Sequence, residues 1–167
     1  MEIIIVRHAL AEEREDFAKK GLEDQFRPLT LKGRKRMQKI CVQMKDFVKD
    51  VDVIVTSPFT RAAQTAQILA QHYPGKKILE IPELVPQSPP QALLKWVRTQ
   101  GRGYKRMMFV GHEPHLSVFA CYMLSGKAES FIDLRKSGIL SLELETFAQA
   151  NAGGAELMYS IPPKIFD

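Results

Sequence analysis

Ile3-Ile4-Ile5-Val6-Arg7-His8-Ala9 is the stretch from which the fold of this 167-residue chain can be predicted. Four β-branched residues in a row, with no polar alternation, predict a strand that is buried on both faces, as in a parallel sheet. Arg7 and His8 follow directly, so this strand would carry two polar side chains to the carboxyl edge of the sheet, where open α/β folds bind their ligands. Because Arg is a cation and His can become one, we expect an anionic ligand.

Two later stretches repeat this order of an apolar run followed by a basic side chain. Residues 51–55 form a short, mostly apolar run, and a turn at Ser57-Pro58 leads to Arg61 at the expected start of a helix. Residues 107–110 form the second run, and His112 follows closely. If the three strands lie side by side and parallel, their basic side chains meet at one edge and form a pocket for a phosphoryl group. The side chains expected to meet there are Arg7, His8, Arg61 and His112.

The remaining pattern alternates helices and strands. Thr30 is a suitable N-cap, and apolar residues at helical spacing continue through Phe47 and Val48, which predicts a helix ending near Lys49. Further helices are expected at 61–70, 90–100 and 116–124, and further strands at 78–81, 138–145 and 156–161. The turn residues between the last two strands predict an antiparallel hairpin. The predicted fold is a three-layer αβα sandwich of one domain, residues 1–167, with a mostly parallel central sheet.

The segment Leu10 to Gln25 is rich in charged residues and has no clear periodicity. Two interpretations remain open: a mobile loop at the active site, or a weak helical turn.

Composition limits the class of protein. The chain is 45% hydrophobic and 26% charged, and no apolar run approaches the roughly 20 residues of a membrane helix. Arg7 interrupts the first apolar run and Glu2 replaces a basic start, so we expect no signal peptide and a cytoplasmic location. The two cysteines, Cys41 and Cys121, fall at helical core positions, which favours buried thiols over a disulfide.

The formal net charge is +5, and a basic block covers residues 32–39. Exposed aromatics or a nucleic-acid-binding module do not accompany it, so we expect no nucleic-acid partner. Two interpretations remain open for the basic residues: a solvated helix face, or attraction of an anionic substrate or acidic phosphoprotein towards the pocket.

Three motifs, Val6-Arg7-His8-Ala9, residues 56–66 around Arg61, and Val110-Gly111-His112, resemble in this order those of the histidine phosphatase superfamily. Arg27-Pro28-Leu29-Thr30, Pro82-Glu83-Leu84 and the short chain are similar to the SixA branch, the small phosphohistidine phosphatases. The resemblance extends from about residue 2 to residue 145 and implies a phosphoglycerate mutase-like fold. Ala9 departs from the pattern, because most members have Gly there, and this puts the shape of the pocket in question.

The resemblance implies a role for each basic residue. His8 would be the nucleophile, which requires a neutral imidazole, and we expect the charges of Arg7 and Arg61 to lower its pKa. The two arginines would hold the phosphoryl oxygens, and His112 would donate to them from the other side. The alternatives are a core histidine at position 8 and surface ion pairs for the arginines.

Four further residues are expected to bind substrate. Arg27 resembles a pocket arginine of the SixA branch, with a helix-flanking ion pair as the alternative, and Ser57 would supply a donor. Glu83 lies where larger members carry a general acid, although a phosphohistidine leaving group needs little acid assistance. His115 is expected at the pocket rim. With His112 it supplies too few ligands for a metal ion, so we expect neither metal nor cofactor.

The sequence thus predicts a metal-independent phosphatase that forms a phosphohistidine on His8. By resemblance, its substrate would be phosphohistidine in a signalling or phosphotransfer protein. A small phosphoester as substrate and a phosphate-binding module without turnover are the alternatives. We expect no membrane partner, and a monomer is the default for an oligomeric state that the sequence does not determine.

Overall fold

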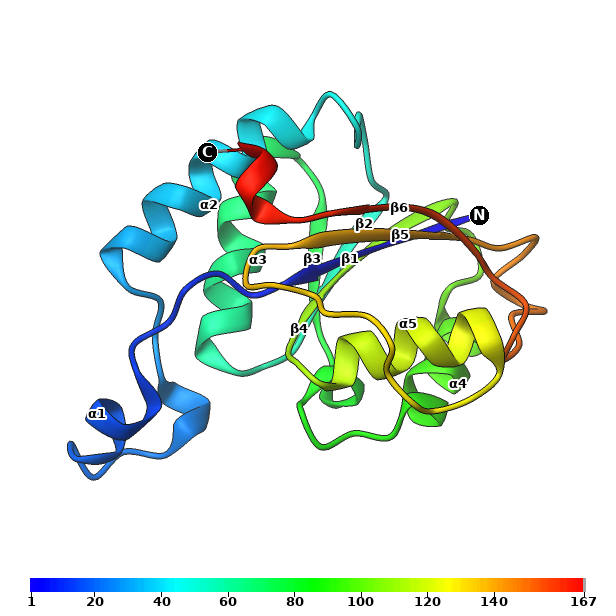
Figure 1. The fold of residues 1–167 in the computed structure, drawn as a ribbon. Helices are drawn as coiled ribbons and strands as arrows, with labels where there is room; N and C mark the ends of the chain where they lie inside the picture. Colours follow the sequence, from blue (N-terminus) through cyan, green and yellow to red (C-terminus); the bar gives the residue numbers. More distant parts are fainter. Residues whose placement is uncertain (167) are drawn as a thin grey trace.

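The computed structural model describes residues 1–166, and its strands form one six-stranded sheet in the order β3-β2-β4-β1-β5-β6 (Figure 1). The strands are β1 (Glu2–Arg7), β2 (Val53–Thr56), β3 (Lys77–Glu80), β4 (Arg106–Gly111), β5 (Ile139–Glu143) and β6 (Glu156–Ile161). Strands β1 to β4 are parallel, whereas β5 is antiparallel to both β1 and β6. The mostly parallel sheet and the C-terminal antiparallel hairpin are therefore confirmed.

The register of the parallel strands places their carboxyl ends at one level. Arg7 on β1 lies opposite Gly111 on β4, and Thr56 on β2 lies opposite Val110. The ladder continues one residue further, because the His8 N–H donates to the Gly111 carbonyl at 3.0 Å and the Ser57 N–H donates to the Val110 carbonyl at 3.0 Å. The segments that follow the three strands consequently start side by side.

Helices cover both faces of the sheet, and the three-layer αβα architecture is confirmed (Figure 1). The helices are α1 (Arg14–Ala18), α2 (Leu31–Met44), α3 (Thr60–His72), α4 (Pro90–Gln100) and α5 (His115–Ser125), with 3-10 turns η1 (Asp24–Phe26), η2 (Pro82–Leu84) and η3 (Pro163–Phe166). Helices α2 and α3 pack on one face and α4 and α5 on the other. Within residues 1–166, the structure contains no helix with the length and apolar character that crossing a membrane requires.

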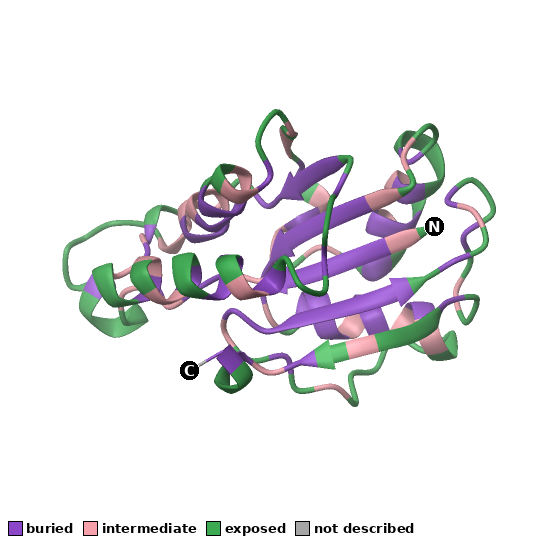
Figure 2. Ribbon diagram, turned by 90° about the horizontal axis from the view of Figure 1, so that it is seen from above, coloured by how far each residue is buried: buried purple, intermediate pink, exposed green. Residues whose placement is uncertain are grey.

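The first strand contributes to both layers of the core because its side chains alternate between the faces. Ile4 and Val6 pack with the apolar residues of α2 and α3, whereas Ile3 and Ile5 pack with those of α4 and α5. Figure 2 shows the central strands buried along most of their length, in contrast to β6, which is mostly exposed. Cys41 and Cys121 are buried free thiols, as predicted.

Two local predictions differ from the structure. Helix α2 ends at Met44, before the predicted end near Lys49, and Phe47 is 52% exposed. The chain turns there because the buried Tyr73 hydroxyl donates to the Val48 carbonyl at 2.7 Å, which fixes the path into β2. The segment from Leu10 to Gln25, for which two interpretations were open, contains the five-residue helix α1, which buries Phe17.

Candidate active site

His8 lies directly after β1 and is only 5% exposed. Its Nδ1 is 2.7 Å from the Ala9 carbonyl, which can only accept, so Nδ1 carries the proton and donates. The Nε–H of Arg61 donates to Nε2 of His8 at 3.3 Å. These two contacts assign the tautomer and leave Nε2 with a lone pair, as a nucleophilic imidazole requires.

The pKa of His8 is lowered to about 3. Burial is the largest cause, the hydrogen bond to the Ala9 carbonyl acts in the opposite direction, and the charges of Arg61 and Arg7 lower the pKa further. The expected lowering of the His8 pKa by Arg7 and Arg61 is therefore present, but removal of the imidazole from water has the larger effect. The ring is neutral throughout the physiological pH range.

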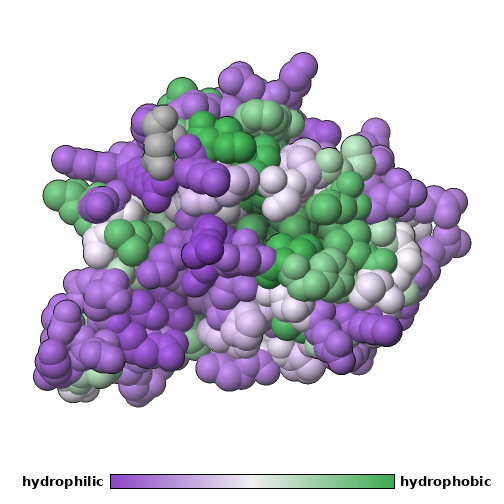
Figure 3. Space-filling model, viewed as in Figure 1, coloured by the Kyte–Doolittle hydropathy of each residue, from purple (hydrophilic) through white to green (hydrophobic). Residues whose placement is uncertain are grey.

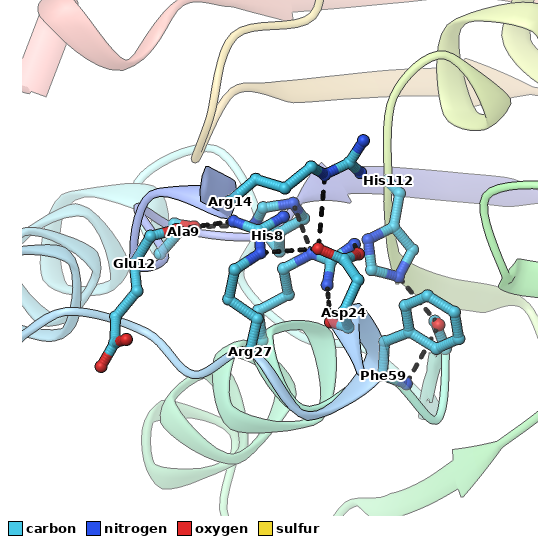
Figure 4. Close-up of polar contacts among 10 residues, drawn as sticks. His8, Ala9, Glu12, Arg14, Asp24, Arg27, Phe59 and His112 are labelled. Carbon is cyan, nitrogen blue, oxygen red and sulfur yellow. Dashed lines mark hydrogen bonds and ion pairs between the residues drawn. The ribbon is translucent and has the colours of Figure 1, made fainter. Parts of the chain in front are cut away.

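His112 lies directly after β4, and its ring centroid is 5.1 Å from that of His8. Its Nε2 is 2.8 Å from Oγ of Ser57, which also accepts the Phe59 N–H at 3.3 Å (Figure 4). Burial, followed by the neighbouring His8, lowers the pKa of His112 to about 2. Its Nδ1 is buried and has no hydrogen-bond partner within residues 1–166.

Arg61 stands in the first turn of α3 and is 2% exposed. Its Nη1 donates to the Asp24 carbonyl at 2.9 Å, and its Nη2 pairs with the Asp24 carboxylate at 3.0 Å. Burial lowers the pKa of Arg61 to about 10, so the guanidinium remains charged at neutral pH. A buried charge of this kind requires an anionic partner, and Asp24 is that partner here.

The sequence analysis did not identify Asp24, which three arginines surround (Figure 4). Besides Arg61, the Arg27 Nε–H donates to its Oδ1 at 2.8 Å, and the Arg14 Nε lies 3.4 Å away. Burial works to raise the pKa of Asp24, but the Arg27 hydrogen bond and the charges of the arginines outweigh it and lower the pKa. The only signal in the sequence was an acid three residues before Arg27, within a segment that seemed too irregular to interpret.

The guanidinium groups of Arg27 and Arg7 each donate a hydrogen bond to a backbone carbonyl. Arg27 Nη1 donates to the Glu12 carbonyl at 2.7 Å, and Arg27 also forms an ion pair, with Asp24, which is the kind of contact considered as the alternative to a pocket role. Arg7 Nη1 donates to the Leu134 carbonyl at 2.9 Å, and its buried Nε has no partner among residues 1–166. Burial is the main cause that lowers the pKa of Arg7.

Thr65 links the two sides of the site. Its hydroxyl donates to the Arg61 carbonyl at 2.7 Å and accepts the Ala9 N–H at 3.1 Å. The turn after β1 is thereby tied to the first turn of α3, which keeps His8 beside Arg61. The Ala9 methyl belongs to the apolar cluster under α2 and α3, so the departure from Gly lies in the core.

His115 and Glu83 are placed differently from the other predicted residues. His115 begins α5 and is 3% exposed, so the prediction that it lies at the pocket rim is wrong. Burial lowers the pKa of His115 to about 4. Neither of its ring nitrogens has a hydrogen-bond partner within residues 1–166. Glu83 lies in η2 and lines a hollow of about 440 Å³ against α4 with Ala92 and Trp96. Within the described residues, no hydrogen bond or ion pair joins Glu83 to His8 or His112.

We expect Asp24→Asn to bind inorganic phosphate about 3- to 10-fold more tightly than the unaltered protein, equivalent to about 0.7–1.4 kcal/mol. The Asp24 carboxylate occupies arginine donors that a phosphate would use, and an amide competes more weakly for them. Isothermal titration with phosphate measures the change. Asp16→Asn is the control, because Asp16 is an exposed carboxylate that pairs with Lys19, outside the arginine cluster. Weaker phosphate binding by Asp24→Asn would mean that Asp24 positions the arginines and does not compete with the ligand.

The site thus consists of two neutral histidines, a serine and arginines near the carboxyl ends of three parallel strands. Comparisons with known proteins identify the family to which the chain is similar. The sequence profile of the histidine phosphatase superfamily (branch 1) matches residues 3–85. An uncharacterized protein of Picosynechococcus sp. PCC 7002 is 34% identical over 143 residues, which cover 85% of this chain and 84% of that protein.

Solved structures of the same fold cover nearly the whole chain. The protein histidine phosphatase SixA complexed with tungstate has a TM-score of 0.83 at 20% identity, with 100% of both chains covered. The alpha-ribazole phosphatase from Shigella flexneri has a TM-score of 0.69 at 18% identity, with 98% of this chain and 97% of that chain covered. A phosphoserine phosphatase from Entamoeba histolytica has a TM-score of 0.68 at 17% identity, with 96% of both covered. The chain belongs to the histidine phosphatase superfamily.

Proposed function

We propose that this protein is a metal-independent phosphatase that removes the phosphoryl group from phosphohistidine in a signalling or phosphotransfer protein. Membership of the histidine phosphatase superfamily supports phosphatase activity in general. The observation that carries the proposal is the unprotonated Nε2 of the buried His8 beside Arg61, with His112 next to it. A neutral imidazole flanked by guanidinium donors is suited to attack a phosphoryl group.

In the first step, the lone pair on Nε2 of His8 attacks phosphorus. The bond between phosphorus and the substrate nitrogen breaks, and the substrate imidazole, which carries a proton on its other ring nitrogen, leaves as a neutral ring with the electron pair of that bond. Nδ1 of His8 keeps its hydrogen bond to the Ala9 carbonyl and so holds the ring in line. In the second step, water attacks phosphorus, His8 leaves with its electron pair, and inorganic phosphate is released.

Arg7, Arg61 and His112 would stabilise the charge that spreads over the equatorial oxygens in both steps. In the ligand-free arrangement, Arg61 donates to Nε2 of His8 and to Asp24. An incoming phosphoryl group would take over these donors, which frees the Nε2 lone pair at the moment the reacting atom arrives. The unpartnered Nδ1 of His112 and Nε of Arg7 supply further buried polar atoms for the same group.

Phosphohistidine is favoured over a phosphoester because, among the described residues, no carboxyl group makes a hydrogen bond or ion pair with His8 or His112. An alkoxide leaving group needs a proton from a general acid, whereas an imidazole is a far better leaving group. The pKa of the Asp24 carboxyl is lowered, so that group is ionised. Burial raises the pKa of Glu113, but its carboxyl group is occupied by the Ser117 N–H and O–H, which it accepts at 3.2 and 2.6 Å. Glu83 lies against α4. The SixA structure with bound tungstate, a tetrahedral oxyanion, is consistent with a phosphate pocket on this fold.

A small phosphoester is the second candidate, since two proteins of the same fold are named as an alpha-ribazole phosphatase and a phosphoserine phosphatase. A substrate panel distinguishes the candidates by kcat/KM. We expect a phosphorylated histidine-transfer domain to exceed phosphoserine and p-nitrophenyl phosphate by about 100-fold or more, which corresponds to about 2.7 kcal/mol of transition-state stabilisation. Glu83→Gln should change turnover of the phosphohistidine substrate by less than about threefold, because no acid is required.

Efficient turnover of a phosphoester, together with its loss in Glu83→Gln, would contradict the phosphohistidine assignment and support the second candidate. Glu80→Gln is a matched control, because Glu80 is an exposed carboxylate at the end of β3. Tight phosphate binding without turnover of any substrate would instead indicate a binding module.

A further inference from the structure

Helix α2 presents a row of exposed lysines: Lys32, Lys35 and Lys39. Residues three, four and seven apart lie on the same side of a helix, and these three span about 10 Å at about 1.5 Å per residue. Residues 31–44 include no Asp or Glu. The row is therefore a continuous cationic surface, and Figure 3 shows hydrophilic side chains over the part of the molecule that holds α1 and α2.

The charge of this row is not neutralised by the rest of the described chain. Within residues 1–166, no hydrogen bond, ion pair or ring contact engages Lys32, Lys35 or Lys39. Other lysines pair with carboxylates at 2.6–2.9 Å, namely Lys19 with Asp16, Lys20 with Glu12, and Lys76 with Asp50. A partner with negative charge would thus find these three ammonium groups without displacing an internal ion pair.

The lysine row lies beside backbone segments that contact Arg7 and His8. A shallow hollow of about 690 Å³ lies along the row, and a smaller one of about 160 Å³ shares Lys32 with it and extends to Leu10 and Ser137. Leu10 is two residues after His8, and the Ser137 N–H donates to the carbonyls of Arg7 and His8 at 3.1 and 3.3 Å. The second hollow also includes Lys136, a further cation. The surface therefore connects α2 with the backbone that carries Arg7 and His8.

We propose that Lys32, Lys35 and Lys39 form a docking surface for an acidic segment of the phosphorylated protein that delivers phosphohistidine to His8. This inference rests on the proposed function and specifies the partner. Complementary charge around a phosphorylated side chain raises the rate of encounter and selects among partners. Leu31 is 68% exposed at the start of the row, so an apolar side chain on the partner next to its acidic residues would complete the contact.

The test compares a triple variant, Lys32→Glu, Lys35→Glu and Lys39→Glu, with an equally charged control, Lys95→Glu, Arg102→Glu and Lys105→Glu. All six positions are exposed, and the control residues lie on α4 and in the loop before β4. We expect the docking variant to lose about 30- to 100-fold in kcat/KM for a phosphorylated histidine-transfer domain with an acidic surface at about 10 mM ionic strength. Its turnover of free phosphohistidine should stay within about twofold, because no row residue contacts His8.

Salt provides a second readout. Raising the ionic strength from about 10 to 150 mM shortens the screening length from about 30 to 8 Å. It should therefore lower kcat/KM of the unaltered protein on the domain and leave that of the docking variant nearly constant. Thermal unfolding by circular dichroism verifies that both triple variants fold.

Three other results would contradict either the docking surface or the proposed function. Unchanged kcat/KM of the docking variant on the domain, or an equal loss in the control, overturns the docking surface while turnover of free phosphohistidine still supports the proposed function. If the unaltered protein turns over neither substrate, the proposed function fails, and binding of the phosphorylated domain to each variant tests the surface alone. Preferential binding of a generic DNA duplex by the lysine row, lost in the docking variant, overturns the proposal in favour of a nucleic-acid surface.

Discussion

His8→Asn is expected to lower kcat on phosphohistidine by about 10⁴-fold or more and to abolish the phosphoenzyme. Asparagine keeps an amide N–H that can reach the Ala9 carbonyl, as Nδ1 of His8 does at 2.7 Å, but it has no nucleophilic nitrogen. The variant should therefore keep the local structure and lose the chemistry. Rapid quenching of labelled reactions into alkaline denaturant, in which phosphohistidine survives, measures the intermediate directly.

His72→Asn is the control, because His72 ends α3 and lies outside the site. Normal labelling of His8→Asn would assign the nucleophile to another residue. The pH profile provides a further readout: the pKa of His8 is lowered to about 3 by burial, so the ring stays neutral and nucleophilic at pH 5, where an ordinary histidine is mostly protonated. A loss of kcat/KM of the unaltered protein that follows protonation of a single group of the free enzyme near pH 6.5 would contradict the buried neutral imidazole.

Arg61→Ala is expected to lower kcat/KM by about 10³-fold, the second largest effect. The substitution removes a guanidinium that donates to Nε2 of His8 and pairs with Asp24. Arg61→Lys should recover less than about tenfold of this loss, because a single ammonium group replaces a planar fork that contacts several acceptors at once. Steady-state kinetics with phosphohistidine, accompanied by thermal unfolding, separates a catalytic defect from a loss of fold.

Arg102→Ala is the matched control, since Arg102 is exposed in the loop before β4. A loss below about tenfold in Arg61→Ala would mean that Arg7 and Arg27 hold the phosphoryl group without Arg61. Full activity of Arg61→Lys would mean that charge alone is sufficient and that the fork has no role.

Much of the framework was predictable because the strands that build it are short and almost wholly apolar. Ile3 to Val6 can only be buried on both faces, and this requires helices above and below the sheet. Parallel strands then place their carboxyl ends at one edge, so the close approach of His8, Arg61 and His112 follows from topology. The end of α2 was not predictable, because the contact between Tyr73 and Val48 joins residues 25 positions apart.

Most of the site residues could be identified from short sequence patterns. An apolar run indicates a buried strand, and the Arg and His, or Gly and His, that follow it indicate the functional groups at the end of that strand. Burial depth, tautomer and ion pairing depend on what packs around each side chain, and only folding settles these. The neutral state of His8 arises mainly from the layers that exclude water from it, and the Asp24 carboxylate pairs with Arg61, which lies 37 positions further along the chain. Contacts between residues far apart in the sequence leave no periodic pattern along the chain. For this reason the role of Asp24 and the burial of His115 could be seen only in the folded structure.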